Sequence, residues 1–239
     1  MGTVPTGKLE RELRKLYLQW VFGLPKHEGD METYIEQFRV RSEALIARLG
    51  GDVARLGVYL ADFPAPRELA LSPVAGVIYD QMQQAAIQAG IMTGLGATDT
   101  ARAMFQAGLD KSFRRLLRLA RTETVSAYWK NQWDSVQGLD LVLVWSAERG
   151  PRTCDYCLSR DGLVVEDPNI RDHPNGRCTL VPTVPARVAY RGTLQADGSV
   201  VVDPKWGGLS APVPQQPQKA RSASPGVRPA PTLQEAGGI

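Results

Sequence analysis

The spacing of apolar residues changes once along this chain, close to Leu139. Before that point they recur at steps of three and four residues, which is the period of an amphipathic helix. After it, the run Leu-Asp-Leu-Val-Leu-Val-Trp opens a stretch rich in β-favouring residues, glycine and proline. The sequence therefore predicts an α+β protein in which a mainly helical N-terminal region precedes a small β-rich module.

Four long helices are predicted in the first 137 residues from apolar stripes, and all but the first also have a start or stop signal. Capping side chains mark the helix starts, and glycines mark the helix ends. The expected helices are Leu9–Val21, Asp30 to a stop at Gly50-Gly51, a third between Ser72-Pro73 and Gly94, and Thr100 to about Gln137 with Asp99 as its cap.

The strands are predicted from short β-favouring runs bounded by turn residues. One pair is expected to form a hairpin across Asp197-Gly198, a favourable turn sequence. The expected strands are Leu139–Trp145, Leu163–Val165, Thr179–Val184, and the hairpin partners Val188–Leu194 and Val200–Val202. From about Gly207 the chain has few large apolar side chains to offset the entropy of ordering, so residues 207–239 are predicted to be a flexible tail.

Charge and hydropathy limit the compartment but name no partner. The net charge of +3 over 239 residues is mildly basic and does not by itself indicate a DNA-binding protein. We expect no membrane association, because no apolar stretch approaches the ~18 residues needed to span a bilayer and no secretory signal is recognisable. We therefore expect synthesis in a reducing cytosol, where cysteines are more often used for metal than for disulfides.

The three cysteines and one of the two histidines form a metal-ligand pattern. Cys154, Cys157, His173 and Cys178 have the spacing C-x2-C-x15-H-x4-C, in which a tight two-residue knuckle meets a distant second pair. Thiolate and imidazole donors in such a set suit tetrahedral zinc. Reduced buried cysteines and a disulfide are the alternatives. A structural zinc is the prediction, because the surrounding loops hold few apolar residues to order them.

Within the predicted fourth helix, Arg121-Thr122-Glu123 is the motif of most interest. Arg121 continues a basic helix face, whose ordinary interpretation is a solvated surface. Glu123 has no cation three or four residues away, so solvent or a distant partner must satisfy it. We predict that Arg121 and Glu123 are structural and join this helix to the metal module.

An ordered set of short motifs resembles the signature of the phage Mu F-like head morphogenesis proteins. No single piece is specific, but the order and spacing together indicate the family. The set covers about a quarter of the chain and consists of Arg121-Thr122-Glu123, Trp145-Ser146, Cys154-x-x-Cys157, Gly162, His173-Pro174-Asn175, Arg177-Cys178 and Leu180-x-Pro182. Gly176 stands where members of the family often have a further cysteine, which leaves Cys3His as the simplest ligand set.

The resemblance implies a minor capsid protein of a tailed phage, acting in head morphogenesis and in genome packaging or ejection. Its implied partners are the portal or major capsid proteins, with packaged DNA as a secondary contact. Its implied location is the virion, in the capsid interior or near the portal, after assembly in the host cytoplasm. No catalytic residues and no cofactor other than zinc are expected, so the protein is predicted not to be an enzyme.

Two other functions compete with this interpretation. A zinc-dependent nucleic-acid-binding module is the first, with the arginines of the fourth helix on phosphates. An HNH-like nuclease is the second, but the run after Cys178 supplies no helix for further catalytic ligands. The predicted organisation is a helical region over residues 1–98, a Mu F-like domain with the long helix and the Cys/His module over residues 99–206, and the tail.

Overall fold

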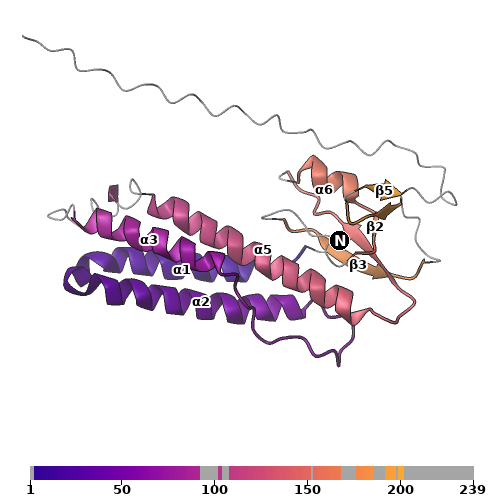
Figure 1. Ribbon diagram of the computed structural model, residues 1–239, viewed down its shortest axis with the longest axis horizontal. Coiled ribbons are helices and arrows are strands. Elements are labelled where there is room, and N and C mark those ends of the chain that lie inside the picture. The colour runs from indigo at the N-terminus through magenta and orange to yellow at the C-terminus, as the bar shows by residue number, and fades with distance from the viewer. Residues whose placement is uncertain are drawn as a thin grey trace, which may run out of the picture.

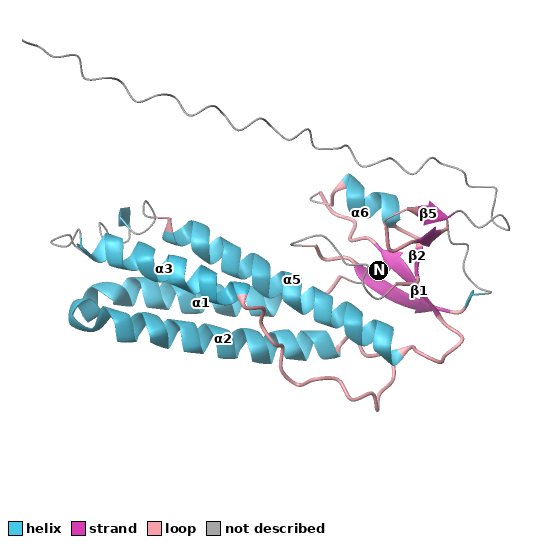
Figure 2. Ribbon diagram, in the orientation of Figure 1, coloured by secondary structure: helices cyan, strands magenta, loops and turns pink. Residues whose placement is uncertain are grey.

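The computed structural model describes residues 3–91, 102–103, 108–151, 153–167, 176–185, 192–197 and 199–201. Over these residues the chain forms a bundle of four long helices beside a five-stranded sheet that carries one short helix (Figures 1 and 2). The predicted α+β class is confirmed. The predicted tail over residues 207–239 and the predicted zinc ligand His173 lie outside the described residues.

The bundle consists of α1, α2, α3 and α5, and a 3-10 helix, η1, joins the first two. Their bounds are Gly7–Gly23 for α1, Leu24–Asp30 for η1, Met31–Arg55 for α2, Val74–Ile91 for α3 and Leu109–Ser135 for α5. Stacked aromatic rings fill the core, with Tyr17 on Phe113 at 3.8 Å and Trp20 on Phe38 at 4.5 Å between centroids. No helix in the described part of the chain is both long and apolar enough to cross a membrane.

Helix α2 runs through Gly50 and Gly51, where the sequence had predicted its end, so that prediction was wrong. The two glycines serve close packing instead of a helix stop. A Cβ on Gly50 would lie 2.7 Å from the Leu69 side chain, and one on Gly51 would lie 2.3 Å from the Arg67 carbonyl oxygen. The segment that crosses here is fixed by the Leu69 N–H, which donates to the Ala47 carbonyl at 2.9 Å. Only residues without a side chain allow this approach.

Helix α5 begins at Leu109, whereas the sequence predicted that the fourth long helix begins at Thr100, so the predicted start of this helix is corrected. Gly108 precedes it with a φ of 91°, a left-handed conformation that glycine adopts at little cost. The helix then continues unbroken for 27 residues to Ser135, close to the predicted end.

Two hydrophobic cores meet along α5. Its first half, with Phe113 and Leu116, belongs to the core of the bundle. Its second half, with Val125 and Trp129, packs into the core beneath the sheet, where Trp129 meets the fully buried Trp145 edge-to-face at 4.7 Å. The cores are therefore joined through α5. The predicted boundary between residues 98 and 99 lies outside the described residues and stays a prediction.

The sheet has the strand order β3-β1-β2-β4-β5. Its strands are β1 (Val142–Ser146), β2 (Val164–Val165), β3 (Thr179–Thr183), β4 (Thr193–Leu194) and β5 (Val200–Val201). Strand β1 runs antiparallel to both neighbours, β2 pairs with β4 in parallel, and β4 pairs with β5 as an antiparallel pair. A short helix that the sequence analysis did not predict, α6 (Asp155–Arg160), lies between β1 and β2 in the chain.

Helix α5 supplies hydrogen bonds that a further strand would otherwise give to β3, an outer strand of the sheet. The buried side-chain amide of Gln132 donates to the Leu180 carbonyl at 2.7 Å and accepts from the Leu180 N–H at 3.3 Å. One turn earlier, the indole N–H of Trp129 donates to the Cys178 carbonyl at 3.0 Å. Because unpaired strand edges are costly when buried and prone to association when exposed, these bonds fix the position of β3 against α5.

Candidate functional site

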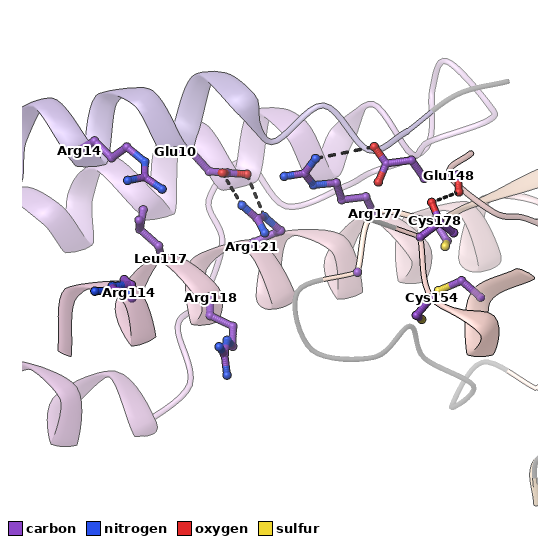
Figure 3. Close-up of a pocket in the computed structure, with 13 residues that line it drawn as sticks. Glu10, Arg14, Arg114, Leu117, Arg118, Arg121, Glu148, Cys154, Arg177 and Cys178 are labelled. Atoms are coloured by element: carbon purple, nitrogen blue, oxygen red, sulfur yellow. Dashed lines mark hydrogen bonds and ion pairs between the residues drawn. The ribbon is translucent and has the colours of Figure 1, made fainter. Parts of the chain in front are cut away.

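A cavity of about 360 Å³ lies where α1, α5 and the cysteine-bearing loops come together (Figure 3). We call it the arginine–cysteine cavity, because its wall holds five arginines and all three cysteines of the chain. The arginines are Arg14 from α1, Arg114, Arg118 and Arg121 from α5, and Arg177 from the segment before β3. Residues far apart in the sequence therefore contribute to one strongly charged site.

Arg121 is buried and forms a two-pronged ion pair with Glu10 of α1. Its Nε donates to Glu10 Oε1 at 2.8 Å, and a terminal nitrogen donates to the other carboxylate oxygen. The Thr6 hydroxyl also donates to Oε1 at 2.8 Å. Burial raises the pKa of the Glu10 carboxyl, but the hydrogen bonds from Arg121 and Thr6 outweigh burial and hold the pKa below its usual 4.5.

One partner of Arg121 therefore lies in the helical bundle, 111 residues away in sequence. The predicted link from Arg121 to the metal module stays a prediction. The module is nevertheless close, because Arg177 also acts electrostatically on Glu10 and its backbone carbonyl accepts from the Val4 N–H at 3.3 Å. The N-terminal segment thus touches the bundle and the cysteine module at the same place.

Glu123 lies on a different side of α5 from this cavity. It is half-buried in a second hollow with the Phe63–Ala70 segment and Lys130. Within the described part of the chain its carboxylate has no hydrogen bond or ion pair, so the structure gives it no contact with the cysteine module. The two outer residues of Arg121-Thr122-Glu123 are therefore separated in space, and Arg121 alone belongs to the site.

A second ion pair closes the cavity near the cysteines. Arg177 lies 3.7 Å from Glu148, and the Glu148 carbonyl accepts from the Thr153 hydroxyl at 2.5 Å. Figure 3 shows Arg177 and Glu148 between the Glu10–Arg121 pair and the cysteine side chains. The pair links the loop before α6 to the segment before β3, which is the same junction that the cysteines occupy.

The three cysteines border the cavity from two segments. Cys154 is exposed at the N-cap of α6, and its carbonyl accepts from the Cys157 N–H at 3.1 Å, which makes the tight turn expected of a C-x2-C pair. Cys157 and Cys178 are buried. Thiols on one tight turn with a third from another segment form a donor set that fits zinc.

Among the described residues, which include the three cysteines, no group of three or more His, Cys, Asp or Glu side chains is arranged so that it could hold a metal ion. The fourth predicted ligand, His173, is outside those residues. The zinc ligand set Cys154, Cys157, His173 and Cys178 therefore stays a prediction, supported by the shared cavity of its three thiols.

Other residues of the motif set shape the backbone around the site. Gly162 has a φ of 79° and donates its N–H to the Trp145 carbonyl at 2.8 Å, while the Trp145 N–H donates to the Leu163 carbonyl at 2.8 Å. Glycine is required by this left-handed turn, which returns the chain from α6 to β2. Leu180 pairs with Trp145 across the sheet. Trp145, Gly162 and Leu180 thus form one continuous unit around β1.

Sequence reasoning missed Glu10 and Arg14 as members of the site, and it treated Arg177 only as a motif residue. Both N-terminal residues lie on a helix with an ordinary amphipathic pattern, so no local signal distinguishes them.

No protein-family model matches the chain, and no curated protein or solved structure matches it either.

Proposed function

We propose that this chain is a minor structural protein of a tailed-phage head that resembles the Mu F-like head morphogenesis proteins. The observation that carries the proposal is the convergence of motif residues spread over some sixty positions. Arg121, Trp145, Cys154, Cys157 and Cys178 all belong to α5, to the sheet core or to the cavity between them. This shared location of the described motif residues supports the proposal.

The proposed role of the cysteine module is structural. Zinc held by Cys154, Cys157, Cys178 and His173 would supply a cross-link between the turn at α6 and the segment before β3. The protein residues around it do the positioning: the Trp129 indole holds the Cys178 carbonyl, and Arg177 with Glu148 holds the two segments together. A site filled by four protein ligands has no open position for substrate, which agrees with a protein that is not an enzyme.

The proposed partners are the portal and the major capsid proteins, met in the host cytoplasm during assembly and retained inside the virion. A rigid connection between bundle and module suits such a role, because α5 is continuous through both cores. A partner bound to the bundle would then hold the module at a fixed position. Packaged DNA is the secondary partner in this proposal.

The experiment that tests the proposal counts the chain in particles. Procapsids and mature virions of the phage that encodes it are purified, and the chain is quantified by isotope-dilution mass spectrometry against the major capsid protein. We expect a fixed, low number of copies in procapsids. Absence of the chain from both particles, with the same chain abundant in the infected-cell lysate, contradicts the proposal.

A further inference from the structure

The wall of the arginine–cysteine cavity has an excess of positive charge. Five arginines face two glutamates, Glu10 and Glu148, and Arg114 is paired with Asp110 beside the cavity, which leaves two positive charges. The proposed zinc site does not remove this excess, because a zinc ion with three thiolates and one neutral imidazole carries a single negative charge. The cavity is thus electrostatically prepared for an anion.

The excess charge is concentrated on two side chains from different helices. Arg121 and Arg177 are paired with the two glutamates, and Arg114 is paired with Asp110 one turn earlier on α5. Arg14 of α1 and Arg118 of α5 are exposed and have no carboxylate partner in the described part of the chain. Two guanidinium groups from separate helices therefore remain to bind a ligand at the same opening.

Basic side chains continue from the cavity along the exposed face of α1. Arg14 borders both the cavity and a shallow neighbouring hollow that includes Arg11 and Lys15. With Lys8, these exposed residues cover about 10 Å of helix at ~1.5 Å per residue. The positive surface is therefore longer than a single phosphate group and fits a repeating anion.

We propose that this surface, from Lys8 and Arg11 on α1 through Arg14 to Arg118 on α5, binds the phosphate backbone of duplex DNA. Guanidinium groups recognise phosphate oxygens through paired hydrogen bonds and need no particular base sequence. The proposal deepens the proposed function by giving residues for the contact with packaged DNA, and it rests on that function for the choice of DNA as the polymer.

The test measures binding of the full chain to a short fluorescein-labelled DNA duplex by fluorescence anisotropy over a series of salt concentrations. The double variant Arg14→Ala/Arg118→Ala removes the two arginines without leaving a carboxylate unpaired. The control is Arg48→Ala/Arg55→Ala on α2, which makes the same change in net charge at two exposed arginines that do not line the cavity. Thermal unfolding followed by circular dichroism checks that both variants keep the fold.

We expect the cavity variant to bind the duplex roughly tenfold or more weakly at ~0.1 M salt and to flatten the dependence of log K on log salt by about 2, as the loss of two phosphate contacts requires. We expect the control to bind like the wild-type chain. Failure of the wild-type chain to bind, or equal weakening by both variants, overturns the inference. Either result leaves the particle count unchanged, so the failure of this inference is distinguishable from failure of the proposed function.

Discussion

Replacing Arg121 with methionine removes the buried contact between α1 and α5 while keeping a side chain of similar length. The side chains of Arg121 and Glu10 are 10% and 16% exposed, so solvent does little to compensate for the loss. Breaking a buried ion pair by removing one partner costs about 3–5 kcal/mol. Glu10 retains its hydrogen bond from Thr6 and the nearby charge of Arg177, so we expect the lower end, about 3 kcal/mol.

The loss depends on pH in a direction that follows from the lowered pKa of Glu10. A carboxyl whose folded pKa lies below its unfolded value contributes stability that is present above the unfolded pKa. That contribution is lost as the pH falls through the folded pKa. The difference between the wild-type chain and Arg121→Met should therefore be constant near neutral pH and should shrink as the pH falls below about 4.5.

The assay is urea denaturation of the wild-type chain, Arg121→Met, Glu10→Gln and the double variant, followed by circular dichroism. A double-mutant cycle isolates the coupling between the two side chains. Arg114→Met is the matched control, because Arg114 pairs with Asp110 one turn away and is 73% exposed. That exposed pair is expected to contribute about 0.3–0.5 kcal/mol. If Arg121→Met destabilises the chain no more than Arg114→Met does, the pair is not the connection described here.

Two further pairs of substitutions test the packing of α5 and of α2, each with a comparison variant. Gln132→Leu leaves the Leu180 N–H without its partner and leaves the Leu180 carbonyl with only the Thr179 hydroxyl, so it should lower the free energy of unfolding by about 1–3 kcal/mol. Gln137→Leu, which loses one exposed bond to the Trp133 carbonyl in the last turn of α5, should have little effect in the same denaturation assay. Gly51→Ala places a Cβ 2.3 Å from the Arg67 carbonyl and should destabilise by about 1–3 kcal/mol. Gly76→Ala, with open space around its Cβ, should stabilise α3 by about 0.5–1 kcal/mol, and thermal unfolding should show shifts of opposite sign for these two variants.

Local sequence patterns predicted the presence of helices and strands more accurately than the residues at which they begin and end. The stripe from Leu9 to Val21 gave α1, and the turn at Asp197-Gly198 correctly predicted a hairpin in which Leu194 pairs with Val200. The predicted helix end at Gly50-Gly51 was wrong because the sequence does not distinguish a glycine that ends a helix from a glycine that allows another segment to pack closely against the helix. The difference depends on the Arg67–Leu69 segment, which no local window contains.

The site was less predictable than the fold because its contacts are long-range. The spacing of Cys154, Cys157 and Cys178 predicted a zinc site, which stays a prediction, and the three cysteines line one cavity. It contained no information about Glu10, which meets Arg121 through the packing of α1 on α5. Glu123 was predicted to join α5 to the metal module because it has no cation nearby in sequence. A half-buried carboxylate that faces a hollow also has no cation nearby in sequence, so this pattern does not distinguish the two situations. Electrostatic partners on different helices of a bundle can therefore be identified only from the tertiary structure.

The central claim is that the residues carrying the head-protein resemblance form one zinc-held module against α5. Its most direct test is elemental analysis of the full chain purified without chelators, together with thiol titration of the wild-type chain and of Cys178→Ser. We predict about one zinc per chain, with loss of the metal in Cys178→Ser while the helical circular-dichroism signal of the bundle persists. A stably folded chain that contains no stoichiometric metal and has three thiols titrating freely would contradict the claim.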